Sequence, residues 1–127
     1  MVEHLRIDAE VPLGDLTPRM VRSIENLAPF GAGNRRPLLV AAAVELAGPA
    51  RRIGGGERHL SFQLRQAGAS ARAVAFGMAE RAEELVPGSR YDVAFSPQLN
   101  TYQGFTRVDL HVKDFRLCEP ARTGPGG

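Results

Sequence analysis

The sequence is poor in the residues that build catalytic, metal-binding and cross-linking sites. Its one cysteine, Cys118, cannot form an intramolecular disulfide and is compatible with a reducing cytoplasm. The three histidines, His4, His59 and His111, are far apart, and no Cys/His pair has zinc-site spacing. P-loop and nucleophile-elbow motifs are missing from the sequence, as are acidic clusters spaced for a metal. These absences argue against an enzyme and predict a chain without a metal or cofactor of its own.

Long apolar segments are missing as well. No apolar run approaches the length needed to cross a membrane. The N-terminus lacks the basic flank and apolar stretch of a signal peptide. Hydrophobic residues make up 43% and charged residues 24% of the 127 residues, which is typical of a globular protein with a real core. We expect a cytoplasmic protein with one domain and a small extension.

Alternation of apolar residues predicts five strands between Pro37 and Leu117. A short helix from Met78 to Val86 separates the third strand from the fourth. Few folds have this order, and it indicates an OB-fold, a mainly β, five-stranded Greek-key barrel that mostly binds oligonucleotides or oligosaccharides. The alternating positions, strand by strand, are Leu38, Val40, Ala42, Val44 and Leu46; Leu60, Phe62 and Leu64; Val74 and Phe76; Tyr91, Val93 and Phe95; and Val108, Leu110 and Val112.

The first of these strands has a competing interpretation. The run Ala41–Ala43 favours a helix. We prefer a strand because Val40 and Val44 are β-branched and because Pro37 and Gly48-Pro49 bracket the segment.

Residues 1–36 are expected to form an extension of a strand, a helix and a turn. Alternation between Leu5 and Val11 predicts the strand. Thr17 is a plausible N-cap for a helix from Pro18 to about Leu27. The glycines that follow permit a compact turn. Residues 37–117 would then be the OB-fold domain, and residues 118–127 a Gly/Pro-rich disordered tail.

Positive charge is concentrated in one part of the chain. Between residues 51 and 72 there are five arginines and a single acid, Glu57, a formal charge of +4 against +2 for the whole protein. Arginine forms bidentate contacts with phosphate and stacks on bases. The abundance of arginine has an equally good explanation in a GC-rich genome. The five are Arg51, Arg52, Arg58, Arg65 and Arg72.

This basic segment is expected to line the ligand groove of the OB-fold. The loop between the first two strands, the loop between the last two, and the face of strands two and three form that groove. Tyr102, in the last loop, is the candidate for stacking on a base of single-stranded nucleic acid. Ordinary surface arginines on a solvated hairpin are the alternative. His59 is expected to be a structural or surface histidine.

Several segments resemble, in order, the C-terminal OB domain of the RecJ family, which comprises single-strand-specific DNA exonucleases of the DHH superfamily. The first, Leu27-Ala28-Pro29-Phe30-Gly31-Ala32-Gly33-Asn34 followed by Pro37, is similar to the signature leading into that domain, and its turn residues are Pro29, Phe30, Gly31, Gly33 and Asn34. The later ones are Gly54 to His59-Leu60, Ala75-Phe76-Gly77, Asn100-x-Tyr102-x-Gly104 and Leu110-x-Val112-x-Asp114.

The resemblance implies a module that holds single-stranded DNA for a nuclease core. The family's catalytic Asp/His clusters, which hold Mn²⁺ or Mg²⁺, do not map onto this chain, so the chain alone is expected not to be an enzyme. The expected partners are single-stranded DNA and the parent nuclease core, not a membrane. Two alternatives stay open: a structural or protein-docking OB module, and an RNA-binding OB domain.

Overall fold

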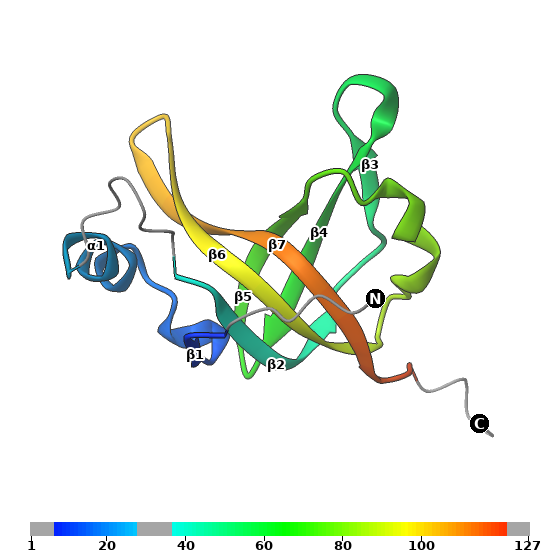
Figure 1. The fold of residues 1–127 in the computed structure, drawn as a ribbon, viewed down its shortest axis with the longest axis horizontal. Helices are drawn as coiled ribbons and strands as arrows, with labels where there is room; N and C mark the ends of the chain where they lie inside the picture. The colour runs from blue at the N-terminus through cyan, green and yellow to red at the C-terminus, as the bar shows by residue number, and fades with distance from the viewer. Residues whose placement is uncertain (1–6, 28–36, 122–127) are drawn as a thin grey trace.

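The computed structural model describes residues 7–27 and 37–121, which form a single seven-stranded sheet with short helices around it (Figure 1). The predicted turn residues Pro29 to Asn34 lie outside the described residues. The elements in chain order are β1 Ala9–Glu10, the 3-10 helix η1 Leu13–Asp15, the helix α1 Pro18–Leu27, β2 Leu39–Leu46, β3 Arg51–Ile53, the 3-10 helix η2 Gly55–Glu57, β4 His59–Gln66, β5 Ala69–Ala75, the 3-10 helix η3 Ala79–Glu84, β6 Arg90–Tyr102 and β7 Phe105–Glu119.

The strand pairing closes on itself. The sheet runs in the order β1-β2-β6-β7-β5-β4-β3, and β2 also pairs with β4. This last contact is short, with Glu45 opposite Arg65 and Leu46 opposite Leu64. The contact between β5 and β7 is parallel, whereas the other pairings within the ring β2-β6-β7-β5-β4 are antiparallel. The mainly β, OB-like architecture expected from the sequence is therefore present.

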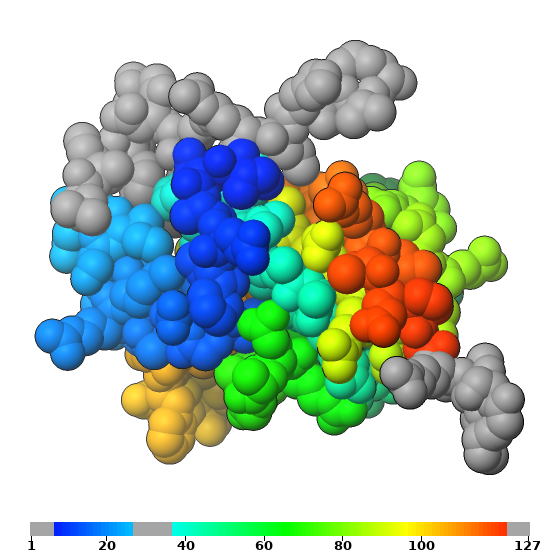
Figure 2. Space-filling model, turned by 90° about the horizontal axis from the view of Figure 1, so that it is seen from below, coloured from blue at the N-terminus to red at the C-terminus, as the bar shows by residue number. Residues whose placement is uncertain are grey.

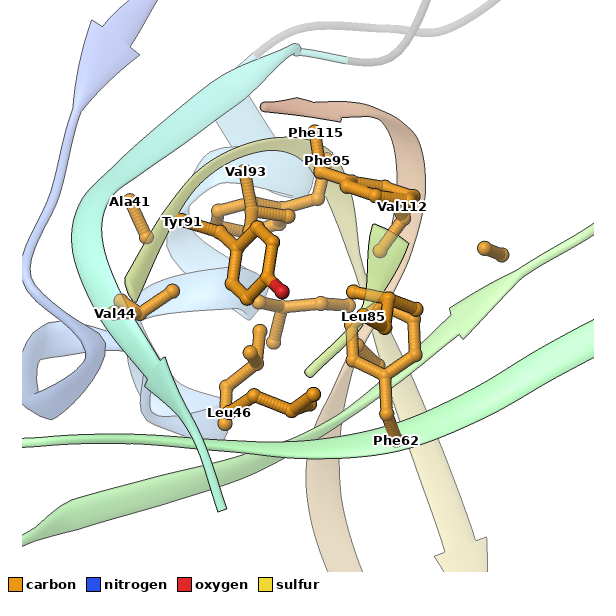
Figure 3. Packing of buried hydrophobic residues seen from close by; sticks show 14 of the residues in the cluster. Ala41, Val44, Leu46, Phe62, Leu85, Tyr91, Val93, Phe95, Val112 and Phe115 are labelled. Carbon is orange, nitrogen blue, oxygen red and sulfur yellow. The ribbon is translucent and has the colours of Figure 1, made fainter. Parts of the chain in front are cut away.

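One apolar core fills the space enclosed by these strands (Figure 3). Phe115 lies between two other core rings, with its centroid 6.0 Å from that of Tyr91 and 6.3 Å from that of Phe62. The buried Tyr91 hydroxyl donates to the Glu84 carbonyl at 2.6 Å and accepts the Val86 N–H at 2.8 Å. These bonds satisfy the hydroxyl and attach the end of η3 to the core.

Strands β4, β6 and β7 bury the residues that the alternation predicts. The first strand does so only in part, because a bulge between Ala41 and Val44 changes which side chains face the core. Before the bulge Leu39 and Ala41 belong to the core, and after it Val44 and Leu46 do. Ala43 has a φ of 54°, and its N–H donates to Asp92 Oδ1 at 3.0 Å. The strand interpretation is confirmed, but Val40 and Ala42 do not join the core cluster.

The predicted inward face of the third strand is wrong. Ala73 and Ala75 are fully buried in the core, whereas Phe76 is 54% exposed. Val74 is buried but is not part of the core cluster. The reason lies across the ladder, where the large core residues of β4 stand opposite alanines of β5 and leave room for nothing larger. These pairs are Leu60 with Ala75, Phe62 with Ala73 and Leu64 with Ala71.

The extension and the ends differ in detail from the predictions. In α1, the Thr17 hydroxyl accepts the Met20 N–H at 3.1 Å, as expected of an N-cap. The short helix before the fourth strand is a 3-10 helix. β7 continues through Cys118 to Glu119, two residues into the segment assigned to the tail. Within residues 7–27 and 37–121, no helix is long and apolar enough to cross a membrane.

Candidate nucleic-acid interface

The candidate interface is the side of β4, β5 and β7 that faces away from the core, called here the outer face. In paired strands, residues in register share a face. One row across the sheet therefore holds Ser61, Val74 and His111, and Arg51 of β3 continues it. Figure 1 shows that the β3–β4 and β6–β7 hairpins both extend beyond the sheet on the same side. The next row holds Gln63, Arg72 and Asp109.

The β3–β4 hairpin carries three exposed arginines, Arg51, Arg52 and Arg58. They make no ion pair with any residue in the described ranges. Register places Arg51 beside Ser61 on the outer face, whereas Arg52 lies opposite the core residue Leu60 and so belongs to the other face of the hairpin. The hairpin therefore presents cations on both of its sides. Such an arrangement is typical of an electrostatic contact with a phosphate backbone.

Turn geometry explains the glycines of this hairpin. Gly54 and Gly56 have φ values of 86° and 71°, a region that suits glycine. A Cβ on Gly54 would lie 2.5 Å from Cδ2 of His59, so the backbone approaches the histidine ring as closely as glycine permits. The turn is therefore packed against the first residue of β4.

The other two predicted arginines already have acidic partners. Arg65 Nη2 lies 2.8 Å from Glu45 Oε2, beside the short β2–β4 contact and at the end of β4 away from the β3–β4 hairpin. This hydrogen bond raises the pKa of Arg65 and lowers the pKa of Glu45. Arg72 is on the outer face, with Nε 3.3 Å from Ser61 Oγ and Nη1 3.5 Å from Asp109 Oδ2. The structure thus groups Arg72 with Arg51 around Ser61 and places Arg65 elsewhere.

A buried carboxylate organises this part of the outer face. The Asp109 side chain is 5% exposed, and its Oδ2 accepts Asn100 Nδ2 at 3.0 Å as well as Arg72. Arg107 Nε lies 3.2 Å from Oδ1, but the geometry is not that of a hydrogen bond, and Oδ1 has no hydrogen-bond partner among the described residues. The Asp109 carboxylate therefore contacts two arginines, Arg72 and Arg107, and one asparagine, Asn100.

Sequence reasoning missed this role, because the local sequence does not show which groups a buried aspartate contacts. The other aspartate near it on β7, Asp114, binds Arg81 at 2.7 Å and is 55% exposed. No group of three or more metal-ligating side chains occurs within residues 7–27 and 37–121. The absence of a cofactor stays a prediction.

Aromatic side chains project from the β6–β7 hairpin. Tyr102 and Phe105 are cross-strand partners at its end and are 70% and 80% exposed. The two residues between them, Gln103 and Gly104, have φ values of 51° and 85°. A two-residue turn with both φ values positive is the tight turn that suits the twist of a hairpin. It holds the predicted stacking residue, Tyr102, at an exposed tip with a second aromatic ring beside it.

Another aromatic group on the outer face was not predicted. The rings of Phe76 and His59 have centroids 5.2 Å apart at 68°, and those of Phe76 and His111 are 5.1 Å apart at 73°. His59 Nδ1 accepts the Gly77 N–H at 2.8 Å. His59 is thus structural, as expected, but it also belongs to an exposed ring cluster. The sequence indicates only the position of His59, because alternation along β4 places it on the face opposite Leu60 and Phe62.

A different surface lies between β1 and β7. Figure 2 shows β1 in dark blue and β7 in orange on either side of surface from β2 and β6. A groove of about 420 Å³ here has an apolar floor and an acidic majority among its charged residues. Its lining is Ile7, Glu10, Val40, Ala42, Asp92, Ala94, Asp114, Phe115 and Arg116. This groove suits a phosphate backbone less well than the outer face does.

Comparisons with known proteins agree with this architecture. The profile of the family described as "RecJ OB domain" matches residues 7–114. The single-stranded-DNA-specific exonuclease RecJ of Bacillus subtilis is 28% identical over 113 residues, which are 89% of this chain and 14% of that protein. The chain therefore spans a small part of that relative, and the matched family is an OB domain, not a catalytic core.

Solved structures give the same picture. RecJ from Thermus thermophilus in complex with Mn²⁺ is 30% identical, with a TM-score of 0.65 over 98% of this chain and 17% of that one. The mitochondrial single-stranded DNA binding protein Rim1 of S. cerevisiae is 13% identical, with a TM-score of 0.54 over 68% of this chain and 99% of that one. The latter likeness concerns the fold alone.

Proposed function

Because this chain belongs to the RecJ OB-domain family, we propose that it binds single-stranded DNA on its outer face. It would serve a metal-dependent, single-strand-specific exonuclease whose Mn²⁺- or Mg²⁺-binding core lies outside this sequence. Its ring of paired strands would then be the five-stranded Greek-key barrel of the OB-fold. The proposal includes the cytoplasmic location expected from the sequence.

One observation carries this proposal. Three arginines without acidic partners among the described residues, Arg51, Arg52 and Arg58, stand on a hairpin beside a face that also exposes aromatic rings. Cations that follow a backbone and rings that stack on bases are the two requirements of single-strand binding. Arg72 extends the cationic track, and Tyr102 supplies a stacking ring. Arg65, held by Glu45, lies outside the track.

The protein-docking alternative also has an observation in its favour, the apolar groove between β1 and β7. A docking function would place the partner in that groove, away from the outer face. The two functions are compatible in one molecule, because they use different surfaces. RNA binding would use the same outer face as DNA binding. A competition between matched DNA and RNA strands would distinguish the two.

Binding of a fluorescently labelled single-stranded oligonucleotide, followed by anisotropy at several salt concentrations, tests the proposal. If three or four arginines contact phosphates, the slope of log K against log salt should be about −2 to −3. A fourfold rise in salt should then weaken binding about 15- to 60-fold. A flat salt response would favour the docking alternative.

A pair of charge-matched variants separates binding by the β3–β4 hairpin from an effect of net charge. Arg51→Ala with Arg52→Ala should reduce the salt slope by about 1.4, since about 0.7 is lost for each phosphate contact on a single strand. Arg90→Ala with Arg116→Ala removes the same charge from exposed arginines paired with Glu119 and Asp92. That control should leave the slope unchanged. Equal losses in the two double variants would show that net charge alone governs binding.

A further inference from the structure

Phe76 is an exposed aromatic residue that the fold holds in place. It follows β5 directly, and 54% of its surface is exposed. The alanines of β5 occupy the core face, so the alternation of the strand directs Phe76 to the outer face. A large apolar ring that is more than half exposed contributes little to stability by burial. Packing of the core therefore does not explain the position of Phe76.

Two histidine rings from neighbouring strands support Phe76. His59 begins β4 and His111 lies within β7, and both make T-shaped contacts with the phenylalanine ring. The bond from Gly77 N–H to His59 Nδ1 fixes the orientation of the His59 ring. Each T-shaped contact uses the face of only one ring, so ring faces remain for another aromatic group. The cluster is therefore assembled before any ligand arrives.

The charges around the cluster indicate what that ligand is. Arg58 immediately precedes His59, and Arg51 lies in the same row of the sheet as His111. A flat aromatic group joined to an anionic chain satisfies both the rings and the arginines, and a nucleotide in a single strand is such a group.

We propose that Phe76, with His59 and His111, is a nucleobase-binding subsite for single-stranded nucleic acid. This rests on the proposed function and adds a second stacking point to the one at the β6–β7 hairpin. Phe105 and His111 are six residues apart on β7, which corresponds to roughly 20 Å along a strand. One single strand would therefore lie across the face and stack at two separate places.

Tryptophan fluorescence tests the subsite directly, because the chain contains no tryptophan. The variant Phe76→Trp places a single reporter in the cluster and keeps a stacking ring. Titration with a thymidine oligonucleotide of about twelve nucleotides should quench its emission as the strand binds. An abasic strand of equal length carries the same phosphates without bases and should leave the emission nearly unchanged. Binding seen by anisotropy without any quenching would overturn the proposal.

Truncation of the same residue gives an independent measurement. Phe76→Ala should weaken binding of the thymidine strand about 5- to 150-fold, as expected for the loss of one stacked base, and should change binding of the abasic strand little. Leu117→Ala is the matched control, because Leu117 is also 54% exposed and lies near the C-terminal end of β7. Both variants should keep their thermal unfolding temperature close to that of the parent chain.

The outcomes separate the two proposals. If the unmodified chain binds the thymidine strand and Phe76→Ala binds as tightly as Leu117→Ala, the subsite is wrong and single-strand binding stands. If the unmodified chain does not bind the strand at all, the proposed function fails, and the subsite fails with it.

Discussion

At the scale of single residues, Arg81 connects η3 to β7 through its guanidinium, and its side chain is only 28% exposed. It donates to both oxygens of Glu84, to Asp114 and to the Phe115 carbonyl, and it lies 4.0 Å from the centroid of the Phe115 ring. These contacts raise the pKa of Arg81, mainly through the bond with Glu84, and the same bond lowers the pKa of Glu84. Because Phe115 belongs to the core, this surface network reaches the interior of the molecule.

Arg81→Met should destabilise the protein by about 1–3 kcal/mol at neutral pH, because it leaves the Phe115 carbonyl without this donor. A lowered carboxylate pKa contributes stability that is present above its ordinary value and lost as pH falls through the lowered value. The difference in the free energy of unfolding between the parent chain and Arg81→Met should therefore be smaller at about pH 3 than at neutral pH. Urea unfolding of both proteins at the two pH values measures this difference. Arg116→Met, at a side chain 82% exposed, should cost less than about 1 kcal/mol. A gap that widens in acid would contradict this account.

Which residues lie on the candidate interface could be predicted from the sequence only in part. Basic charge and turn composition locate Arg51, Arg52, Arg58 and Tyr102, because these residues lie in hairpins whose positions follow from neighbouring strands. The partner of a charged residue is set by tertiary contacts, so the pairing of Arg65 with Glu45 and the role of Asp109 had no local signal. In the sequence, an apolar residue such as Phe76 is indistinguishable from a core residue. Only the pairing of β5 with β4 shows that the alanines of β5 face the core.

At the scale of elements, strand positions could be predicted more reliably than strand faces. Alternation within β4 is regular, and in β6 and β7 it correctly identifies Tyr91, Val93, Phe95, Val108, Leu110 and Val112 as buried. The register of β6 and β7 also shifts, between Ala94 and Phe95, so the buried Phe115 does not follow the parity of Val112. β2 contains a bulge, and one extra residue moves every later side chain to the other face. β5 is rich in alanine, which carries little information about burial, so its parity depends on the larger residues of β4.

The β3–β4 turn links the arginines of the interface to its rings, because the Gly54 backbone lies against His59. Gly54→Ala should strain a residue with a φ of 86° and displace the His59 ring, at a cost of about 1–2 kcal/mol. Exchange of the Gly77 amide, which His59 accepts, should become faster. Gly55→Ala, where a Cβ would have no neighbour within 4 Å, is the matched control and should leave that amide unchanged. Equal protection of the Gly77 amide from hydrogen exchange in the two variants would contradict this account.

At the scale of the whole molecule, the two faces carry different chemistry. The outer face combines cations with exposed rings, while the groove between β1 and β7 is apolar with acidic residues at its edge. β1 pairs with β2 in parallel, and Asp8 Oδ2 accepts the Leu38 N–H at 2.8 Å. These contacts attach the N-terminal extension to the sheet on the groove side of the molecule (Figure 2). A strand of DNA on the outer face and a protein in the groove would therefore not compete.

We expect the chain to bind single-stranded DNA without cleaving it. Metal-dependent hydrolysis of a phosphodiester by two ions needs ligands that hold them about 4 Å apart, and the described residues contain no cluster of three or more ligating side chains. The purified chain, incubated with Mn²⁺ and single-stranded DNA labelled at either end, should leave the strand intact at protein concentrations that saturate it. Measuring anisotropy in the same reaction ensures that an intact strand is also a bound strand. Degradation that persists through successive purification steps and follows this protein would show that it contains a nuclease site of its own.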